Sequence, residues 1–416
     1  MRRSTFIKIP SLVVLVLCAG LMQGCESQPV RLAENAVADY YMDDYAAAEA
    51  VLEPLARKTD ENFVLNNDRL GSVALARYDL NVAEDAFLRA YEVINSVGVN
   101  NGGRTLGATV ISENIKVWKG EPFERAMVNF YLGLIYYMRH DYNNARASFE
   151  NALFKLHDYG ESADKADAYR EQESNFALGY LMLGKSYQRL GRDDDARKAF
   201  DRAVALRPYL SAVADFNRNL QSNVLLAVDY GRGPLKATTR DGVLVGFVPT
   251  PWEEGPAPSP IVIVDGRQIN LQGADRPPVD LLALAQDRQW QSIDTIRAVK
   301  SGLGAAMIAG GAGYAALDRH ANPYIALGLI AGGLVVRATS HADVRQWEML
   351  PRTTFILPLS LPPGKHDVTV DFPNVPGLHQ EWRGLDIPAQ GEATYYFRML
   401  RYAYGPYNWP PAGASQ

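Results

Sequence analysis

One five-position pattern returns three times in the first half of the chain, and it limits the fold more than any other feature. Each copy has a glycine, a residue one helical turn later, and then alanine, phenylalanine and alanine in a following segment. The three copies are Gly71, Ala74, Ala83, Phe87 and Ala90; Gly133, Tyr136, Ala145, Phe149 and Ala152; and Gly184, Tyr187, Ala196, Phe200 and Ala203. Unrelated amphipathic helices would not repeat these residue types at one set of offsets. The pattern therefore predicts stacked copies of one helical unit, each burying its apolar face on the next.

The copies resemble the tetratricopeptide repeat, whose unit is a pair of helices. Alanine suits the tightest contact between helices, and phenylalanine fills the space beside it. Pro208 stands where the second helix of the last copy should end. A weaker first copy contains Tyr45, Ala48, Leu52 and Leu55. We therefore expect an all-α array over residues 30–223, with a last amphipathic helix at about 209–223 covering its end.

Two insertions interrupt the array. The gaps between copies are about 28 and about 17 residues longer than the 34-residue repeat requires, which places the insertions near 95–122 and 157–173. Insertions in repeat proteins map to one face, often the binding face. Trp118, Glu121 and Arg125 are therefore candidate contacts for a partner. The alternative is that Trp118 and Phe123 fill the gap between repeats, as aromatic side chains commonly do.

The repeat register also identifies the side chains that would line the concave groove of the array. The third copy offers the apolar Met127, Phe130 and Tyr137, and the fourth offers Lys185 and Arg189. Two interpretations of the apolar part stay open: the first insertion folds back into the groove, or a helix or strand of a partner protein occupies it. In the second case the apolar side chains anchor the partner, and the two cations receive an acidic part of it.

The N-terminus predicts export and lipidation. Three basic residues precede an apolar run over 9–22, which is typical of a signal peptide and short for a membrane span. The run leads to Gly24-Cys25, which resembles the lipobox of bacterial lipoproteins. The resemblance implies cleavage after residue 24, a lipid on Cys25 and a short tether over 25–29. Glu26, in place of aspartate, favours anchoring at the outer membrane, facing the periplasm. Cys18 lies in the signal peptide, so no disulfide is expected in the mature chain.

From residue 224 the pattern changes from helices to short strands with frequent proline and glycine. A hairpin is expected at 261–271, with Asp265-Gly266 in a type I′ turn. Further strands are expected at 292–300, 353–361, 366–372 and 393–402, with Pro362-Pro363-Gly364 turning one pair, and a short helix at 279–286. We expect an antiparallel sandwich or barrel-like domain over 224–402 and a Pro/Gly-rich tail over 403–416. The fold class is then α+β, with several domains.

A Gly/Ala-rich apolar insertion over 302–336 interrupts the β pattern. It consists of two stretches, 302–317 and 321–336, separated by Asp318-Arg319-His320. Each stretch is short for a membrane span. Small residues favour close helix packing, so three interpretations remain: a helical hairpin packed on the β domain, a hairpin that dips into a bilayer, or a self-association surface.

Composition and motifs exclude several classes of function. The net charge is −5, with no basic cluster of the kind that binds nucleic acid. The chain has none of the G-x-S-x-G, H-E-x-x-H or C-x-x-C motifs. Its six histidines do not have metal-ligand spacing. We therefore expect no catalytic residues, no cofactor and no metal, and a protein that is not an enzyme.

Four further segments, at 119–126, 230–236, 343–351 and 361–364, are similar to a family of bacterial tetratricopeptide-repeat envelope lipoproteins. The resemblance implies architecture and compartment but no mechanism. The expected function is a lipid-anchored scaffold or adaptor that binds an envelope protein in its groove. The alternative is a structural subunit that self-associates through 302–336 as a homo-oligomer. An enzyme with an unrecognised site is the weakest hypothesis.

Overall fold

The computed structural model describes residues 28–95, 117–156, 158–160, 170–172, 175–218, 222–239, 244–286 apart from 252, 254 and 272, 344–401, 405–411 and 414. Several predictions lie outside these residues: the signal peptide and Cys25, most of the first insertion, the strand at 292–300 and the apolar insertion at 302–336.

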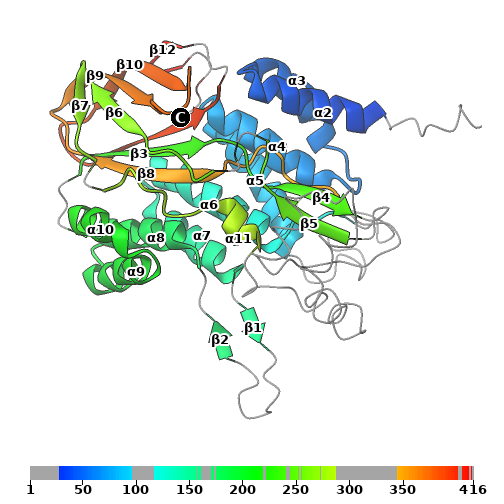
Figure 1. Ribbon diagram of the computed structural model, residues 1–416, viewed down its shortest axis with the longest axis horizontal. Helices are drawn as coiled ribbons and strands as arrows, with labels where there is room; N and C mark the ends of the chain where they lie inside the picture. Colours follow the sequence, from blue (N-terminus) through cyan, green and yellow to red (C-terminus); the bar gives the residue numbers. More distant parts are fainter. Residues whose placement is uncertain are drawn as a thin grey trace, which may run out of the picture.

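Four helix pairs form the N-terminal array (Figure 1). They are α2 (Gln28–Tyr41) with α3 (Tyr45–Ala56), α4 (Phe63–Ala76) with α5 (Leu80–Asn95), α6 (Pro122–Met138) with α7 (Tyr142–Phe154), and α8 (Ala177–Arg189) with α9 (Asp193–Leu206). A 3-10 turn, η1 (Pro208–Leu210), and α10 (Ser211–Arg218) follow and pack on α9. Local capping sets several helix starts: Asp44 and Asp141 accept backbone N–H groups at the starts of α3 and α7.

The contact between glycine and phenylalanine is what the repeated pattern encodes. A Cβ atom added at Gly71, Gly133 or Gly184 would lie 2.6–2.8 Å from the ring of Phe87, Phe149 or Phe200, respectively. Each ring therefore occupies the space that a side chain on the first helix would need. The register predicted for the three copies is confirmed.

The register makes a direct prediction about packing. Gly133→Leu should lower the free energy of unfolding by about 1–3 kcal/mol, because the new side chain must displace the buried ring of Phe149. Thermal melting followed by circular dichroism measures the effect. Gly255→Leu is the control, since no atom of the described residues lies within 4 Å of a Cβ atom at that position. Equal melting temperatures for both variants would show that the register is wrong.

In the described residues, the β region that follows contains two main sheets. The three-stranded sheet has the order β11 (Ala393–Met399), β3 (Val224–Tyr230), β8 (Thr353–Leu359). The five-stranded sheet has the order β12 (Tyr407–Asn408), β10 (His379–Ile387), β9 (Gly364–Asp371), β6 (Ile261–Val264), β7 (Arg267–Ile269). The β region also contains the hairpin β4 (Leu235–Thr239) with β5 (Leu244–Val248) and the short helix α11 (Leu281–Gln286). The hairpin β1 (Asp158–Gly160) with β2 (Arg170–Gln172) lies earlier in the chain, between α7 and α8.

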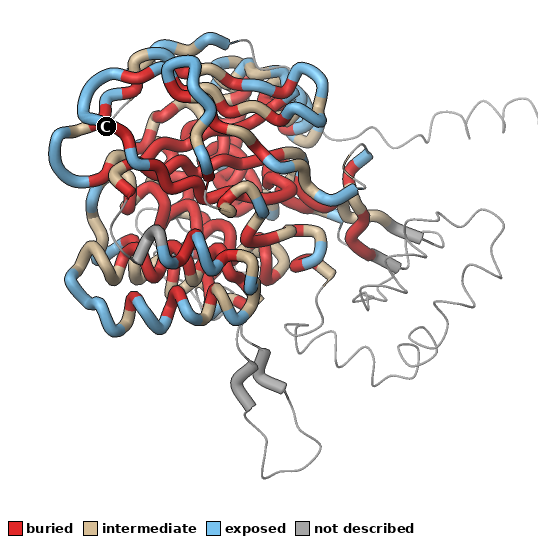
Figure 2. Tube along the Cα trace, turned by 60° about the vertical axis from the view of Figure 1, so that its left-hand side comes forward, coloured by how far each residue is buried: buried red, intermediate tan, exposed pale blue. Residues whose placement is uncertain are grey.

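The three-stranded sheet is a middle layer, with the helical array on one face and the five-stranded sheet on the other (Figure 1). Successive residues of a strand point to opposite faces, and β3 shows both contacts. Asp229 accepts a hydrogen bond from Tyr131 of α6, while the ring of Tyr230 lies 4.7 Å from that of Phe372, beyond β9. All seven residues of β3 are buried for this reason. Figure 2 shows the buried residues concentrated in this middle layer and the helices beside it.

The fold class is confirmed: a helical repeat array is followed by a mainly β region. The hairpin at 261–271 is also confirmed, since β6 and β7 pair antiparallel and both Asp265 and Gly266 have positive φ. The short helix at 279–286 is present as α11.

Two expectations about the β region are wrong. The sheets are not purely antiparallel, because β11 pairs with β3 in parallel and β12 pairs with β10 in parallel. Pro362-Pro363-Gly364 does not turn a paired hairpin, because β8 and β9 belong to different sheets and the segment crosses between them. The tail contains β12, which the sequence analysis did not predict.

Candidate functional site

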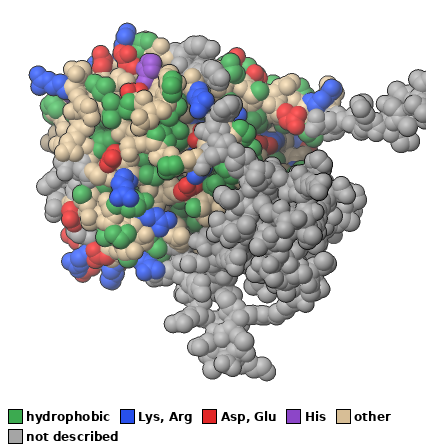
Figure 3. All heavy atoms as spheres, viewed as in Figure 1, with side chains coloured by type: hydrophobic (Ala, Val, Ile, Leu, Met, Phe, Trp, Pro, Cys, Tyr) green, Lys and Arg blue, Asp and Glu red, His purple; other side chains and the backbone are tan. Residues whose placement is uncertain are grey.

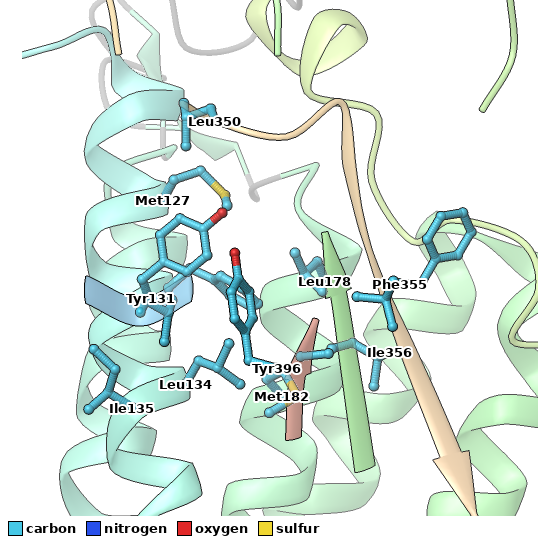
Figure 4. Packing of buried hydrophobic residues seen from close by; sticks show 14 of the residues in the cluster. Met127, Tyr131, Leu134, Ile135, Leu178, Met182, Leu350, Phe355, Ile356 and Tyr396 are labelled. Atoms are coloured by element: carbon cyan, nitrogen blue, oxygen red, sulfur yellow. The ribbon is translucent and has the colours of Figure 1, made fainter. Parts of the chain in front are cut away.

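The first helix of each repeat faces the three-stranded sheet, so the concave groove of the array is filled by the same chain. Side chains from α2, α4, α6 and α8 all contact the β region. The contacts are Tyr40 with Arg398, Arg69 with Glu348, Tyr131 with Asp229, and Lys185 with Glu392. Figure 4 shows the apolar part of this interface, where Met127, Tyr131 and Leu134 of α6 lie opposite Tyr396 and Ile356.

Glu392, the residue before β11, is held by three of the predicted groove residues. Its Oε1 accepts from the Tyr137 hydroxyl at 2.7 Å, and its Oε2 accepts from Lys185 Nζ at 2.8 Å and Arg189 Nη2 at 2.7 Å. Ser222 Oγ lies 3.3 Å from the same Oε2. The side chain of Glu392 has no exposed surface, and that of Lys185 has 1%. We call these five residues the Glu392 clamp.

Charge pairing keeps this carboxylate ionised inside the protein. Burial alone would raise the pKa of Glu392, but Lys185 and Arg189 together hold it below its usual value. Burial lowers the pKa of Lys185, and the carboxylate opposes that shift. The ammonium group and the carboxylate therefore depend on one another to stay charged.

The two other candidate groove residues, Met127 and Phe130, are fully buried. The ring of Phe130 lies 5.7 Å from that of Phe149 and 6.1 Å from that of Phe176. Met127, Phe130, Tyr137, Lys185 and Arg189 thus all belong to the packed interior or the clamp. The acidic group expected opposite the cations is present, but it comes from the chain itself. Binding of another protein through these five residues stays a prediction, and it would require β11 to leave the groove.

Neither of the two occupants considered for the apolar groove is the one observed. A strand of the β region fills it, and most of the first insertion lies outside the described residues. The sequence gives only a weak indication that β11 occupies the groove, because Glu392 is a single acidic residue in front of an ordinary strand pattern.

Asp229 is the second buried carboxylate of the interface, and the sequence analysis did not single it out. It accepts hydrogen bonds from the hydroxyl groups of Tyr131, Tyr396 and Thr354. Burial raises its pKa, and Arg398 and the three hydroxyl groups oppose the shift. The sequence could have indicated this site, because Asp229 is an aspartate inside the apolar run 224–230. A charged residue is almost never fully buried alone, so partners for it were to be expected.

Three of the segments that carry the family resemblance meet at the start of α6. Lys236 forms an ion pair with Glu121 at 3.0 Å and donates to the carbonyl of Arg345 at 2.9 Å. Glu124 Oε1 accepts from the backbone N–H of Trp347 at 2.7 Å. These contacts join segments 119–126, 230–236 and 343–351, and they make the start of α6 a structural junction.

Glu124 caps the backbone at the start of α6 from the N3 position and is also the centre of this junction. Its Oε2 accepts from the backbone N–H of Glu121, which completes a capping box. Burial raises the pKa of Glu124 to about 7, while Lys236 and the two backbone N–H groups lower it. Trp118, a candidate partner contact, is 5% exposed and donates from Nε1 to the carbonyl of Arg345. Its position matches the interpretation in which it fills a gap.

The described residues contain no group of three or more His, Cys, Asp or Glu side chains placed to hold a metal ion. Within the same part of the chain, no helix has the length and apolar character needed to cross a membrane. On the face seen in Figure 3, charged side chains of both signs are scattered among apolar ones, with several over α9.

Comparison with protein-family models identifies the last repeat. The family model "Tetratricopeptide repeat" matches residues 177–210, which contain α8 and α9. Two solved structures of MamA are similar to part of the chain. The first has 15% sequence identity, covers 44% of this chain and 81% of that chain, and has a TM-score of 0.30. The second has 14% sequence identity, covers 46% of this chain and 79% of that chain, and has a TM-score of 0.32. A structure of BtubC (BKLC) from P. vanneervenii has 16% identity, covers 48% of this chain and 72% of that chain, and has a TM-score of 0.30.

A search of curated proteins found no match. The repeat match agrees with the glycine–phenylalanine contacts seen in three helix pairs. Arrays of this kind serve as protein-interaction scaffolds. The chain is therefore a tetratricopeptide-repeat-containing protein, in which the array is joined to a mainly β region.

Proposed function

We propose that this chain is a lipid-anchored scaffold of the bacterial cell envelope. In this proposal Cys25 carries the lipid, the outer membrane holds it, and the folded part faces the periplasm, where it binds an envelope protein. The basic and apolar N-terminus ending in Gly24-Cys25 supports the anchoring. The repeat array supports the scaffold role.

One observation carries the proposed binding mode: the Glu392 clamp holds the β region in the groove that such arrays offer to partners. In this arrangement, which we call the cradle arrangement, the concave side of the array holds the β region of the same chain. The partner then binds on the outer surface of the array and the sheets. Opening the groove would separate buried ions from their partners, which costs several kcal/mol.

The clamp also favours a second candidate mode. Lys185, Arg189 and Tyr137 already hold a carboxylate, so an acidic partner segment could replace Glu392 in the groove, with Met127 and Phe130 as anchors. In that case Glu392→Gln should increase capture of the partner. Under the first mode the same change leaves capture unchanged or lowers it through lost stability.

The structural-subunit hypothesis remains a separate proposal, because residues 302–336 lie outside the described part of the chain. Deletion of 302–336 distinguishes it. A scaffold keeps its oligomeric state in size-exclusion chromatography with light scattering, whereas a self-associating subunit falls from an oligomer to a monomer.

Anchoring has its own test. Cys25→Ser should move the protein from the membrane fraction to the soluble fraction, because the acyl chains provide the stable attachment in this proposal. Cell fractionation with immunoblotting measures the distribution. Cys18→Ser is the matched control, since that cysteine lies within the predicted signal peptide. If the Cys25→Ser protein resists carbonate washing and stays with the membrane, the lipid is not the anchor and residues 302–336 become the candidate.

A further inference from the structure

A cavity of 470 Å³ lies where the turn between α4 and α5, the end of α6, β11 and the C-terminal segment meet. Its walls include Tyr78, Met138, Thr394, Tyr395 and Trp409. Its size falls within the range of ligand sites in proteins. We call it the β11 cavity.

The cavity lies along the free edge of a strand. Among the strands of the described residues, β11 pairs with β3 on one side and with none on the other. Ala393 donates its N–H to Asn223 on that side. Because successive backbone groups of a strand point to opposite edges, the N–H and C=O groups of Thr394 and Tyr396 point the other way, away from β3.

Side chains of the array cover this edge of β11 at the residues two positions before and two positions after Thr394. The Tyr78 hydroxyl accepts from the N–H of Tyr396 at 2.8 Å and donates to its carbonyl at 2.5 Å. His140 Nε2 lies 3.0 Å from the carbonyl oxygen of Glu392. Two side chains thus take the place of a neighbouring strand at Glu392 and Tyr396, and the position between them opens into the cavity.

The Thr394 side chain supplies an independent sign of a ligand. Thr394 is 8% exposed and lines the cavity, and its Oγ1 has no hydrogen-bond partner among the residues that the structure describes. A buried hydroxyl without a partner costs about 1–3 kcal/mol. A ligand that bonds to this hydroxyl would remove that cost.

The walls favour an apolar side chain. The Trp409 ring lies 4.9 Å from the rings of Tyr78 and Tyr395 and stands nearly perpendicular to both. Met138 adds an adaptable apolar surface. At the rim, Arg139 is already paired with Glu84, and Asp386 presents an exposed carboxylate. The rim therefore favours a basic residue in the ligand.

We propose that the β11 cavity binds an extended peptide segment of a partner protein, which adds beside β11 at Thr394. The backbone of the peptide pairs with the N–H and C=O of Thr394 and bonds to its hydroxyl. An apolar or aromatic side chain enters between Tyr78, Met138 and Trp409, and a flanking lysine or arginine meets Asp386. The proposal deepens the proposed scaffold function, since it names where and in what form the partner binds. Strand addition of this kind draws affinity from main-chain hydrogen bonds and specificity from side-chain pockets.

The test uses the full lipidated protein in detergent and a phage library of random heptapeptides. We expect enrichment of peptides that combine an apolar or aromatic residue with a basic neighbour. A recovered peptide, made synthetically, is then titrated by fluorescence anisotropy. N-methylation of the backbone amide that pairs with Thr394 should weaken binding at least about tenfold, because it removes one ladder hydrogen bond and blocks approach to the strand.

Thr394→Val is the most informative variant. It keeps the shape of the side chain and removes a hydroxyl that has no partner in the described part of the chain, so the melting temperature should stay the same or rise. Peptide binding should weaken by about three- to tenfold. Met138→Arg, at the end of α6, should abolish binding by filling the cavity.

Three results would overturn the proposal. They are no enriched peptide, equal binding to Met138→Arg, or equal affinity for the N-methylated peptide. Binding of tetra-N-acetylchitotetraose, in place of any peptide and with loss of binding in Met138→Arg, would assign the cavity to glycans and also overturn it. None of these results depends on Cys25 or on membrane attachment, so failure here is distinguishable from failure of the envelope-scaffold proposal.

Discussion

The double variant Phe130→Ala/Tyr137→Ala should unfold the array or lower its melting temperature by more than 10 °C. Both side chains have 0% exposed surface. Truncating one buried phenylalanine typically costs about 3–5 kcal/mol, and Tyr137 also loses its hydrogen bond to Glu392. Differential scanning calorimetry measures the change.

Two variants act as controls. Tyr137→Phe removes only the hydroxyl group and should cost about 1–3 kcal/mol, since it leaves one oxygen of Glu392 without its donor. Phe154→Ala truncates a side chain of α7 that is 50% exposed and should change stability little. If the double variant melts like the wild type while losing a partner protein, Phe130 and Tyr137 face an open groove and the cradle arrangement is wrong.

The array was predictable because its defining contact is local. A glycine on one helix and a phenylalanine on the next lie in the same repeat, so the sequence offsets alone identify the pair. Gly133 and Phe149 meet as the repeat register requires. The same applies to the hairpin at Asp265-Gly266, where two residues with positive φ set the turn.

The occupant of the groove was not predictable in this way. An apolar surface at Met127 and Phe130 indicates that something covers it, but it carries no information on whether the cover comes from the same chain. Lys185 and Arg189 correctly indicated an acidic partner. Its identity as Glu392 depends on a contact across about half the chain, which no local pattern encodes.

In the β region, too, local sequence patterns did not identify every strand or its neighbours. Strands with clear alternation, such as β9, were identified from sequence, whereas β3 was not, because it is buried on both faces and reads as a continuous apolar run. The parallel pairing of β11 with β3 joins segments far apart in the chain. The sequence pattern of a single strand does not specify the direction of its neighbour.

Replacing Glu392 with glutamine should lower the free energy of unfolding by about 3–5 kcal/mol at neutral pH, as breaking a buried ion pair typically does. The change leaves the ammonium group of Lys185 buried without its counter-charge, while Arg189, with 18% of its side chain exposed, can still reach water. Chemical denaturation monitored by tryptophan fluorescence measures the loss. Glu53→Gln is the matched control, because its ion pair with Arg57 is exposed and should contribute less than about 1 kcal/mol.

The pH dependence of stability distinguishes the electrostatic contribution of Glu392 from the contribution of its packing. The pKa of Glu392 is lowered in the folded protein, so its contribution is fully present above the pKa of an unfolded glutamate and is lost as the pH falls through the lower folded value. The stability difference between wild type and Glu392→Gln should therefore be large at about pH 6 and shrink below about pH 4. Adding Lys185→Met to Glu392→Gln should recover part of the loss, since it removes the unpaired cation. A difference that persists unchanged at low pH, or a double variant no more stable than the single one, would mean that packing rather than charge holds the β region in the groove.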